Sequence, residues 1–366
     1  MNEPDSTTPA VEEILTRVRT HDFHPVNAEN FTIDRDLRAD GIATLSDRDW
    51  LVRLLAVRDL VRAGTDATAE IRASLRDTDH HVRYVCAKAL GICGAESATD
   101  DLERVVRTDP NDLVRSQAVM ALGQLEADES LSLLEATVET DSRDVSHQAE
   151  LAVAQIEAGA GATPALRTAY RGLDPSTFGR IDVGQIRPDF TLPDTDDVEH
   201  SPRDLATDDD WLVLLWVFAD WCPVCHREFE ELIELRDAFA AAGVSVATIE
   251  CHDRFRGRVM VGEALDPAYW FAEESFQETY TEEIWWPHLL DRAGAVGATY
   301  GVDPTAFAVH AEFINRPATV VIDPDGIVRF AYFGTFWGDR PSVDATLEMI
   351  RTETFAFEHP DRLQST

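Results

Sequence analysis

The segment FADWCPVCHREFEEL (residues 218–232) decides how the second half of the chain is interpreted. It continues the apolar run WLVLLWVF (211–218), whose length and composition predict a buried strand. Beyond it, apolar residues recur at helical spacing, which predicts an amphipathic helix over Val224–Ala242. Cys222 and Cys225 therefore lie where a strand ends and a helix begins.

This position has a chemical consequence for the two thiols. The free N–H groups and the dipole at a helix start stabilise an anion, which lowers the pKa of a cysteine in the first turn. The Cys-x-x-Cys spacing places both sulfurs on one side of that turn, so a disulfide can form and open with little backbone motion. We expect the ring of Trp221 to form an apolar shoulder beside the sulfur. The pattern predicts redox chemistry between thiols and disulfides.

Further apolar runs predict strands at Val244–Ile249, Ala318–Ile322 and Val328–Phe333, and helical spacing recurs over Val343–Thr352. Strands that alternate with helices indicate an α/β domain with at least some parallel strands. Cys251 follows the strand at Val244–Ile249. Because parallel strands end at the same edge of a sheet, we expect Cys251 near the other two cysteines, as a candidate third redox thiol.

Four segments carry a family resemblance. Residues 218–232 resemble the active-site segment of thioredoxin-like proteins, in particular the TlpA-like and ResA-like thiol–disulfide oxidoreductases. GQIRPDFTLPD (184–194) resembles the entry hairpin of the wider redoxin and AhpC/TSA group. WPHLLDRAGAVGATYGV (286–302) resembles the segment before the cis-proline of that family, and RPATVVIDPDG (316–326) resembles the cis-proline strand and its turn. The resemblance covers residues 180–355 and implies a thioredoxin fold.

The resemblance also implies roles for single residues. Cys222 would be the attacking thiolate, Cys225 the buried resolving thiol and Pro317 the cis-proline that faces the disulfide. Glu228 stands where relatives often have an acid that handles protons near the thiols. The alternative for Glu228 is an exposed acid that the helix dipole favours. The function that follows is thiol–disulfide exchange on a protein or a low-molecular-weight thiol or disulfide.

Peroxiredoxins share this fold and the entry hairpin, and a thiol peroxidase of the AhpC/TSA type with antioxidant activity is the first alternative. Their motif is Pro-x-x-x-Thr-x-x-Cys, with a distant arginine that helps to bind peroxide. When that cysteine is aligned with Cys225, Phe218 takes the proline position and Cys222 the threonine position. The arginine position falls on Pro317, next to Arg316. These three departures favour disulfide exchange.

The second alternative is a zinc-binding or non-catalytic interaction module. A structural zinc site usually has four Cys or His ligands. This half offers Cys222, Cys225, Cys251, His226 and His252, but no second Cys-x-x-Cys or Cys-x-x-His pair. We therefore expect neither a metal nor a cofactor.

The first half of the chain contains a repeat. Arg53, Arg83, Arg115 and His147 stand at matching positions, with spacings of 30, 32 and 32 residues. Each lies in a helical pattern, and two of these patterns end in Ala-Leu-Gly, which we interpret as helix C-caps. Amphipathic stretches precede three of them, at Thr68–Leu75, Thr99–Val106 and Leu131–Val138. Paired helices at this period predict an α-solenoid. The pairs resemble short HEAT-like repeats over residues 34–172, which implies a docking scaffold for a protein partner.

Composition limits the function classes. The chain has 68 acidic and 32 basic residues, a net charge of -36, and Lys88 is its single lysine. Such a charge repels phosphate backbones and anionic lipids, so we expect neither nucleic-acid nor membrane binding. The composition resembles that of halophilic cytoplasmic proteins. Five cysteines are too few for a disulfide scaffold, and the N-terminus lacks the pattern of a signal peptide, so we expect a cytoplasmic location.

The path from Cys251 to Pro317 is unusually long for a thioredoxin fold and rich in aromatic residues over 252–288. This insertion predicts either an extra helical layer with its own small core or a cap over the Cys-x-x-Cys pair that selects a substrate. A change of pattern near Gly172–Gly184 separates the predicted domains, residues 34–172 and 180–355.

Overall fold

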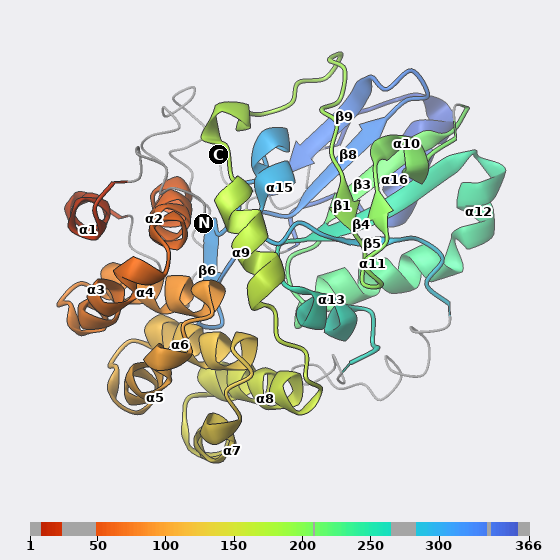
Figure 1. Ribbon diagram of the computed structural model, residues 1–366. Coiled ribbons are helices and arrows are strands. Elements are labelled where there is room, and N and C mark those ends of the chain that lie inside the picture. The colour runs from red at the N-terminus through yellow and green to blue at the C-terminus, as the bar shows by residue number, and fades with distance from the viewer. Residues whose placement is uncertain (1–8, 24–48, 208, 265–282, 335–337, 358–366) are drawn as a thin grey trace, which may run out of the picture. The chain divides into compact units, whose positions relative to one another are not determined.

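The computed structural model describes residues 9–23, 49–207, 209–264, 283–334 and 338–357 (Figure 1). They form two compact units. The first, called here the helical unit, comprises Met1–Leu173 together with Thr305–Ile314. The second, called here the redox unit, comprises Asp174–Pro304 and Asn315–Thr366. The helical unit therefore includes a short segment from the second half of the chain.

Paired helices build the helical unit, as the repeat predicts. They stack in chain order, except that the last helix, Thr163–Gly172, packs on the helices at Asp49–Ala63 and His80–Cys93 (Figure 1). Residues 34–48, the predicted start of this domain, lie outside the described residues. The helices are α1 (Val11–Thr20), α2 (Asp49–Ala63), α3 (Thr68–Ala73), α4 (His80–Cys93), α5 (Thr99–Thr108), α6 (Asp112–Gln124), α7 (Leu131–Thr140), α8 (Arg143–Glu157) and α9 (Thr163–Gly172). Single 3-10 turns lie at Thr65–Ala67, Ser74–Arg76, Glu96–Ala98, Asp128–Ser130 and Pro175–Thr177.

The repeated arginines connect one repeat to the next. Arg83 Nε donates to Asp109 Oδ2 at 2.7 Å, and Arg115 Nη2 donates to Asp141 Oδ1 at 2.7 Å. In both pairs the aspartate follows the first helix of the next repeat, α5 or α7. The sequence period thus corresponds to a ladder of ion pairs along the stack.

The Ala-Leu-Gly ends of two repeats are not helix caps, contrary to our prediction. Helix α4 continues past Gly91 to Cys93 and ends at Gly94 in the left-handed region, while α6 continues past Gly123 to Gln124. A Cβ at Gly91 would lie 2.8 Å from Cβ of Ala121 on α6. These glycines are therefore required for the close approach of neighbouring helices rather than for termination.

The segment taken from the second half is a hairpin, β6 (Phe307–Val309) and β7 (Glu312–Ile314), which pairs antiparallel. Arg53 Nη2 donates to the carbonyl oxygen of Thr305 at 2.8 Å, and its guanidinium lies 3.9 Å from the ring centre of Phe313. Gln148 Nε2 donates to Glu312 Oε2 at 3.2 Å. Arg53, the first arginine of the repeat series, thus binds the hairpin, whereas Arg83 and Arg115 form the ion pairs between repeats.

A five-stranded sheet of order β5-β4-β3-β8-β9 forms the centre of the redox unit. Strand β3 is parallel to β4 and antiparallel to β8, and β4 is parallel to β5, so the predicted parallel pairing is confirmed. The strands are β1 (Leu192–Pro193), β2 (Glu199–His200), β3 (Trp211–Trp216), β4 (Val244–Glu250), β5 (His288–Leu290), β8 (Ala318–Ile322) and β9 (Val328–Phe333). The helices are α10 (Pro202–Leu205), α11 (Pro223–Glu234), α12 (Arg236–Ala241), α13 (Arg254–Met260), α15 (Ala295–Tyr300) and α16 (Val343–Thr352).

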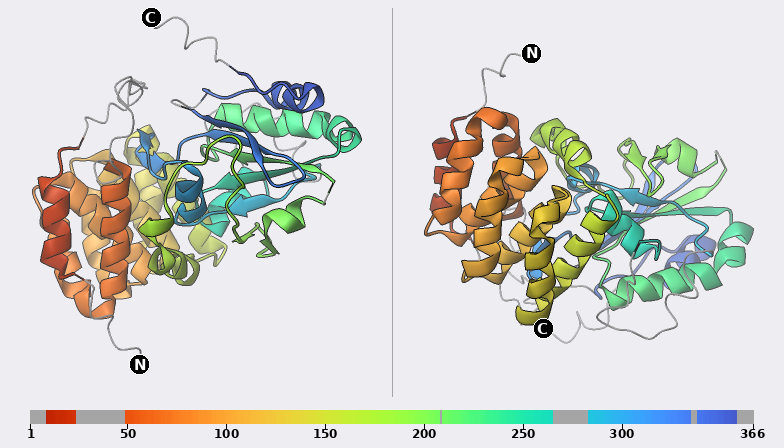
Figure 2. Two further views of the ribbon diagram at one scale, coloured as in Figure 1. Left: turned by 90° about the horizontal axis from the view of Figure 1, so that it is seen from above. Right: turned by 60° about the horizontal axis from the view of Figure 1, so that its bottom comes forward.

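Both faces of this sheet are covered. Trp216 at the end of β3 is buried on one face and packs on Tyr300 of α15, with ring centres 5.3 Å apart. Helices α11 and α16 pack together, and Figure 2 shows them on one side of the sheet. Every residue of β3 after Trp211 is buried, as expected for a strand covered on both sides.

One predicted helix has different bounds, and one predicted segment lies largely outside the described residues. The helix predicted over Val224–Ala242 is divided at Leu235 into α11 and α12. Of the aromatic-rich insertion 252–288, residues 265–282 lie outside the described residues, so the choice between a layer and a cap stays open. Within the described ranges, none of the helices combines the length and the apolar character that a bilayer crossing needs.

Candidate redox site

The two cysteines lie at the junction that the sequence predicts. Strand β3 ends at Trp216, and α11 begins at Pro223, which occupies the first helical position that proline favours. Cys222 is the N-cap residue, and Cys225 is the third residue of the helix. Both thiols are free, and both residues are completely buried at 0% exposure.

Cys225 accepts two hydrogen bonds at its sulfur. The backbone N–H of Phe218 donates to Cys225 Sγ, with 3.2 Å between nitrogen and sulfur. Arg340 Nη2 donates to the same sulfur at 3.1 Å, and this guanidinium is itself buried. A buried anion is stable only when a charge and hydrogen-bond donors surround it, and the sulfur of Cys225 has both.

The two thiols differ in their pKa values as a result. Burial acts to raise the pKa of Cys225, but the hydrogen bond from Cys222, the charge of Arg340 and the Phe218 N–H outweigh it and hold that pKa well below its ordinary value. Burial and the hydrogen bond to Cys225 raise the pKa of Cys222 well above its ordinary value. The two donors face Cys225 Sγ, which does not favour the low pKa expected for Cys222, and that expectation stays a prediction.

Glu228 lies beside the same guanidinium. Its Oε1 is 2.8 Å from Arg340 Nε, and its side chain is buried one helical turn beyond Cys225. Burial raises the pKa of Glu228 to about 8 and outweighs the opposite effect of Arg340. Glu228 is thus no exposed helix-start acid; it belongs to a buried group with Arg340 and Cys225.

Buried contacts fix the loop that leads to Cys222. Asp220 forms an ion pair with Arg256 of α13, whose Nε donates to Asp220 Oδ1 at 3.0 Å. The His226 ring bonds to the carbonyl oxygen of Asp220. Trp221 is 3% exposed and packs edge-to-face on Phe218, with ring centres 5.8 Å apart. Its contribution to substrate binding stays a prediction.

Pro317 lies just before β8, which pairs Ala318 with Trp216 of β3. Its carbonyl oxygen accepts a hydrogen bond from Gly334 N–H at 2.8 Å, which extends the β8–β9 pairing. The described residues include no cis peptide bond, so the expectation of a cis-proline at Pro317 is wrong: the residue enters the strand as ordinary trans backbone.

Cys251 follows the last residue of β4 and is partly exposed. The pairing of Trp216 with Ile249 confirms that β3 and β4 end at the same edge. The placement at that edge is as expected, and the role of Cys251 as a third redox thiol stays a prediction.

Sequence reasoning missed Arg340, Arg256 and Asn315. Arg340 is 115 residues from Cys225 along the chain, in the segment GDRP (338–341), which carries no motif. Its only signal in the sequence was indirect: in the peroxidase comparison the arginine position is occupied by Pro317, so the cation would come from another position. Asn315 donates from Nδ2 to the carbonyl oxygen of Val217 at 2.9 Å.

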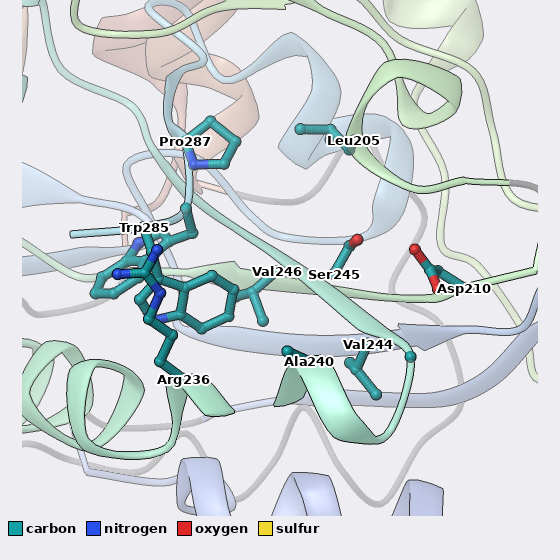
Figure 3. Close-up of a pocket in the computed structure, with 11 residues that line it drawn as sticks. Leu205, Asp210, Arg236, Ala240, Val244, Ser245, Val246, Trp285 and Pro287 are labelled. Carbon is teal, nitrogen blue, oxygen red and sulfur yellow. The ribbon is translucent and has the colours of Figure 1, made fainter. Parts of the chain in front are cut away.

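A separate pocket of about 330 Å³ lies in the redox unit (Figure 3). It is lined by the first residues of β4, by Arg236 and Ala240 of α12 and by Trp285, Trp286 and Pro287, with Leu205 and Asp210 opposite. The redox cysteines follow the carboxyl end of β3, whereas this pocket lies at the beginning of the parallel strand β4, and none of its lining residues is a cysteine. Among the described residues, no group of three or more His, Cys, Asp or Glu side chains is arranged to hold a metal ion.

Known proteins resemble the two halves separately. Residues 183–331 match the model of the AhpC/TSA family. Residues 41–123 match a HEAT-repeat model, and residues 114–140 match the PBS lyase HEAT-like repeat. A peroxiredoxin of Thermococcus kodakarensis is 26% identical over 147 residues, which is 40% of this chain and 60% of that protein. The chain thus spans less than two thirds of the length of this curated relative.

Two solved structures are also similar to part of this chain. The peroxidoxin BcpB from Mycobacterium tuberculosis is 23% identical with a TM-score of 0.37, over 47% of this chain and 98% of that one. A peroxiredoxin-like protein from Aquifex aeolicus is 20% identical with a TM-score of 0.35, over 48% of this chain and 88% of that one. The family matches thus assign similarity to the AhpC/TSA family to residues 183–331 and similarity to HEAT-type repeats to residues 41–140.

Proposed function

We propose that the redox unit is a two-cysteine thiol peroxidase in which Cys225 attacks the peroxide and Cys222 resolves the product. The observation that carries the proposal is the pair of donors, Phe218 N–H and Arg340 Nη2, that converge on Cys225 Sγ. Arg340 supplies the cation that the sequence comparison with peroxiredoxins lacked. Full burial of both sulfurs also favours a small oxidant over a folded protein disulfide.

The proposed reaction has two steps. The Cys225 thiolate attacks the terminal oxygen of a hydroperoxide, the O–O bond breaks, and its electron pair leaves with the alkoxide or hydroxide. The leaving oxygen takes a proton, for which the neutral carboxyl of Glu228 is a source, and Cys225 becomes a sulfenic acid. The Cys222 thiol then attacks that sulfur, water leaves, and a Cys222–Cys225 disulfide remains. An external dithiol reduces the disulfide and completes the cycle.

Thiol–disulfide exchange remains the second candidate. It is favoured by the Cys-x-x-Cys spacing and by the hydrogen bond between the two thiols, which keeps them ready to form a disulfide. In this reaction Cys225 rather than Cys222 would carry the first mixed disulfide, because the thiolate resides there.

A single-turnover experiment separates the candidates. We expect the Cys222→Ser variant to consume one equivalent of hydrogen peroxide and to form a sulfenic acid on Cys225, which dimedone traps for mass spectrometry. Cys225→Ser should consume none. Fast reduction of a small disulfide together with slow peroxide consumption in the wild type would instead support disulfide exchange. The assays should cover several salt concentrations, because the net charge is -36.

We further propose a reducing, cytoplasmic setting and a protein partner docked by the HEAT repeats. The sparse cysteines support the first proposal and the HEAT matches the second. Binding of the purified chain to a candidate reductase, compared with and without residues 1–173, tests the docking role.

A further inference from the structure

The peptide group between Val217 and Phe218 is bonded at both ends. Its N–H donates to Cys225 Sγ at 3.2 Å, and its carbonyl oxygen accepts from Asn315 Nδ2 at 2.9 Å. A peptide group is planar, so the directions of its C=O and N–H are fixed to each other. A side chain that holds the carbonyl therefore also aims the N–H.

Asn315 is rigidly placed for this contact. It is completely buried, and its Nδ2 also donates to the carbonyl oxygen of Arg316 at 3.0 Å. The next residue, Arg316, pairs with Asp303 at 3.1 Å and donates from Nη1 to the carbonyl oxygen of Gly334 at 2.7 Å. The amide of Asn315 is thus held against Val217 by contacts that do not involve the cysteines.

We propose that Asn315 is a positioning residue for the thiol reaction: its side-chain amide orients and polarises the Val217–Phe218 peptide group, whose N–H stabilises the anion on Cys225 Sγ. The effect on the sulfur is indirect and passes through one peptide group. Hydrogen bonds in such a chain strengthen one another in a buried environment. This inference rests on the proposed function only in taking Cys225 as the reacting thiolate.

A purely structural role makes a different prediction. A buried carbonyl needs a partner, and Asn315 could serve Val217 for stability alone. If Asn315 served stability alone, its replacement would lower the urea concentration at which half of the protein unfolds and would leave the titration of Cys225 unchanged. If Asn315 is a positioning residue, its replacement also shifts the pH at which the Cys225 thiolate forms.

The test uses the full-length chain with Cys222→Ser, so that a single thiol of the pair titrates. The rate at which iodoacetamide alkylates Cys225, followed by peptide mass spectrometry, gives the midpoint of thiolate formation. Asn315→Leu keeps a similar volume without a donor, and Asn315→Ala is the smaller second variant. We expect both to raise the midpoint by about 0.5–1 pH unit, the effect of one weakened hydrogen bond.

Thr319→Val is the matched control. Thr319 is also completely buried, follows Asn315 closely in the chain, and its hydroxyl has no hydrogen-bond partner within the described part of the chain. We expect the midpoint of Cys225 thiolate formation in the Thr319→Val variant to equal that of the Cys222→Ser protein. The inference is overturned if the Asn315 variants shift the midpoint no further than Thr319→Val does.

A measurement on the unsubstituted asparagine covers the case in which neither variant folds. In the isotope-labelled Cys222→Ser protein, the Phe218 amide and the Asn315 side-chain amide resonances should both move as Cys225 titrates. Movement of the Phe218 signal alone would overturn the inference. Failure of the proposed function is distinct: a shifted midpoint with no peroxide consumption would remove the peroxidase and leave the role of Asn315 intact.

Discussion

Cys86 in the helical unit and Cys225 in the redox unit are both completely buried, yet the pKa values of their thiols are shifted in opposite directions. Burial raises the pKa of Cys86 far above its ordinary value, and within the described residues no hydrogen bond to its sulfur counteracts the effect. Cys225 experiences the same burial, but Arg340, Phe218 and Cys222 together reverse its effect. The groups aimed at the sulfur, rather than the degree of burial, separate a core cysteine from a reactive one.

The largest test of this contrast replaces each cysteine by serine. Cys225→Ser should lower the rate of peroxide consumption more than about a thousandfold, because the nucleophile is lost. Cys86→Ser should leave that rate unchanged and lower the free energy of unfolding by about 1–3 kcal/mol, because a hydroxyl is buried among apolar groups. Stopped-flow kinetics and urea unfolding provide the two readouts. Equal loss of activity in both variants would contradict the assignment of Cys225 as the reactive thiol and of Cys86 as a core residue.

Removal of the Arg340 charge should bring the pKa of Cys225 closer to that of Cys86. Arg340→Met keeps the length of the side chain without its charge, so the pKa of Cys225 should rise by about 1–2 units. The rate of alkylation of Cys225 at pH 7 should fall about 10–100-fold, and its pH profile should move to higher pH. Arg340→Lys should restore part of the rate. A profile that stays in place would mean that Arg340 does not stabilise the thiolate.

The carboxyl of Glu228 provides a smaller effect with a clear pH signature. Its raised pKa of about 8 keeps it protonated in the folded chain at neutral pH, so Glu228→Gln should lower the peroxidase rate about tenfold and abolish the decline in rate above pH 8.

Stability should respond as well, with a defined sign. Between the ordinary carboxyl pKa of 4.5 and about 8, the unfolded chain releases the proton while the folded chain keeps it. The wild type should therefore lose stability as pH rises through this window, and Glu228→Gln should lose less. Urea midpoints at pH 5 and pH 8 for both proteins check the sign; identical pH dependence would show that Glu228 is ionised throughout.

The smallest expected effect concerns Cys251, which lies between the two extremes because it is partly exposed at the active edge of the sheet. Cys251→Ala should change peroxide turnover less than about twofold, since no step of the proposed cycle needs a third thiol. Peptide mapping of oxidised Cys225→Ser sharpens the result: a Cys222–Cys251 crosslink would give Cys251 a part in the mechanism.

The fold could be predicted from the sequence where the signal is local. Ala318–Ile322, Val328–Phe333 and Val343–Thr352 have the predicted bounds, because buried strands and an amphipathic helix each leave a periodic pattern. The divided helix at Leu235 and the continuous helix at Gly91 were missed. The continuous helix at Gly91 depends on the close approach of Ala121 from another helix, which leaves no periodic pattern in the sequence.

The same distinction applies to the site. Cys222, Cys225 and Glu228 were found because they share one helix start with a recognisable spacing. Arg340 contacts Cys225 from 115 residues away along the chain, and Asn315 contacts Val217 from 98 residues away. The sequence thus predicted which thiols are present, whereas the donors that face Cys225 Sγ are brought there by the tertiary fold and leave no local pattern.

The β6–β7 hairpin has a consequence for how the chain reaches its native state. HEAT repeats fold through contacts between neighbours, which are local in sequence and form quickly. The hydrogen bonds from Arg53 to Thr305 and from Gln148 to Glu312 instead span 252 and 164 residues. The entropy of closing such loops grows only slowly with length, but contacts of this separation form late. During synthesis the helices can therefore assemble long before their last piece leaves the ribosome, and until then Arg53 and Tyr84 lack the aromatic ring of Phe313 that covers them.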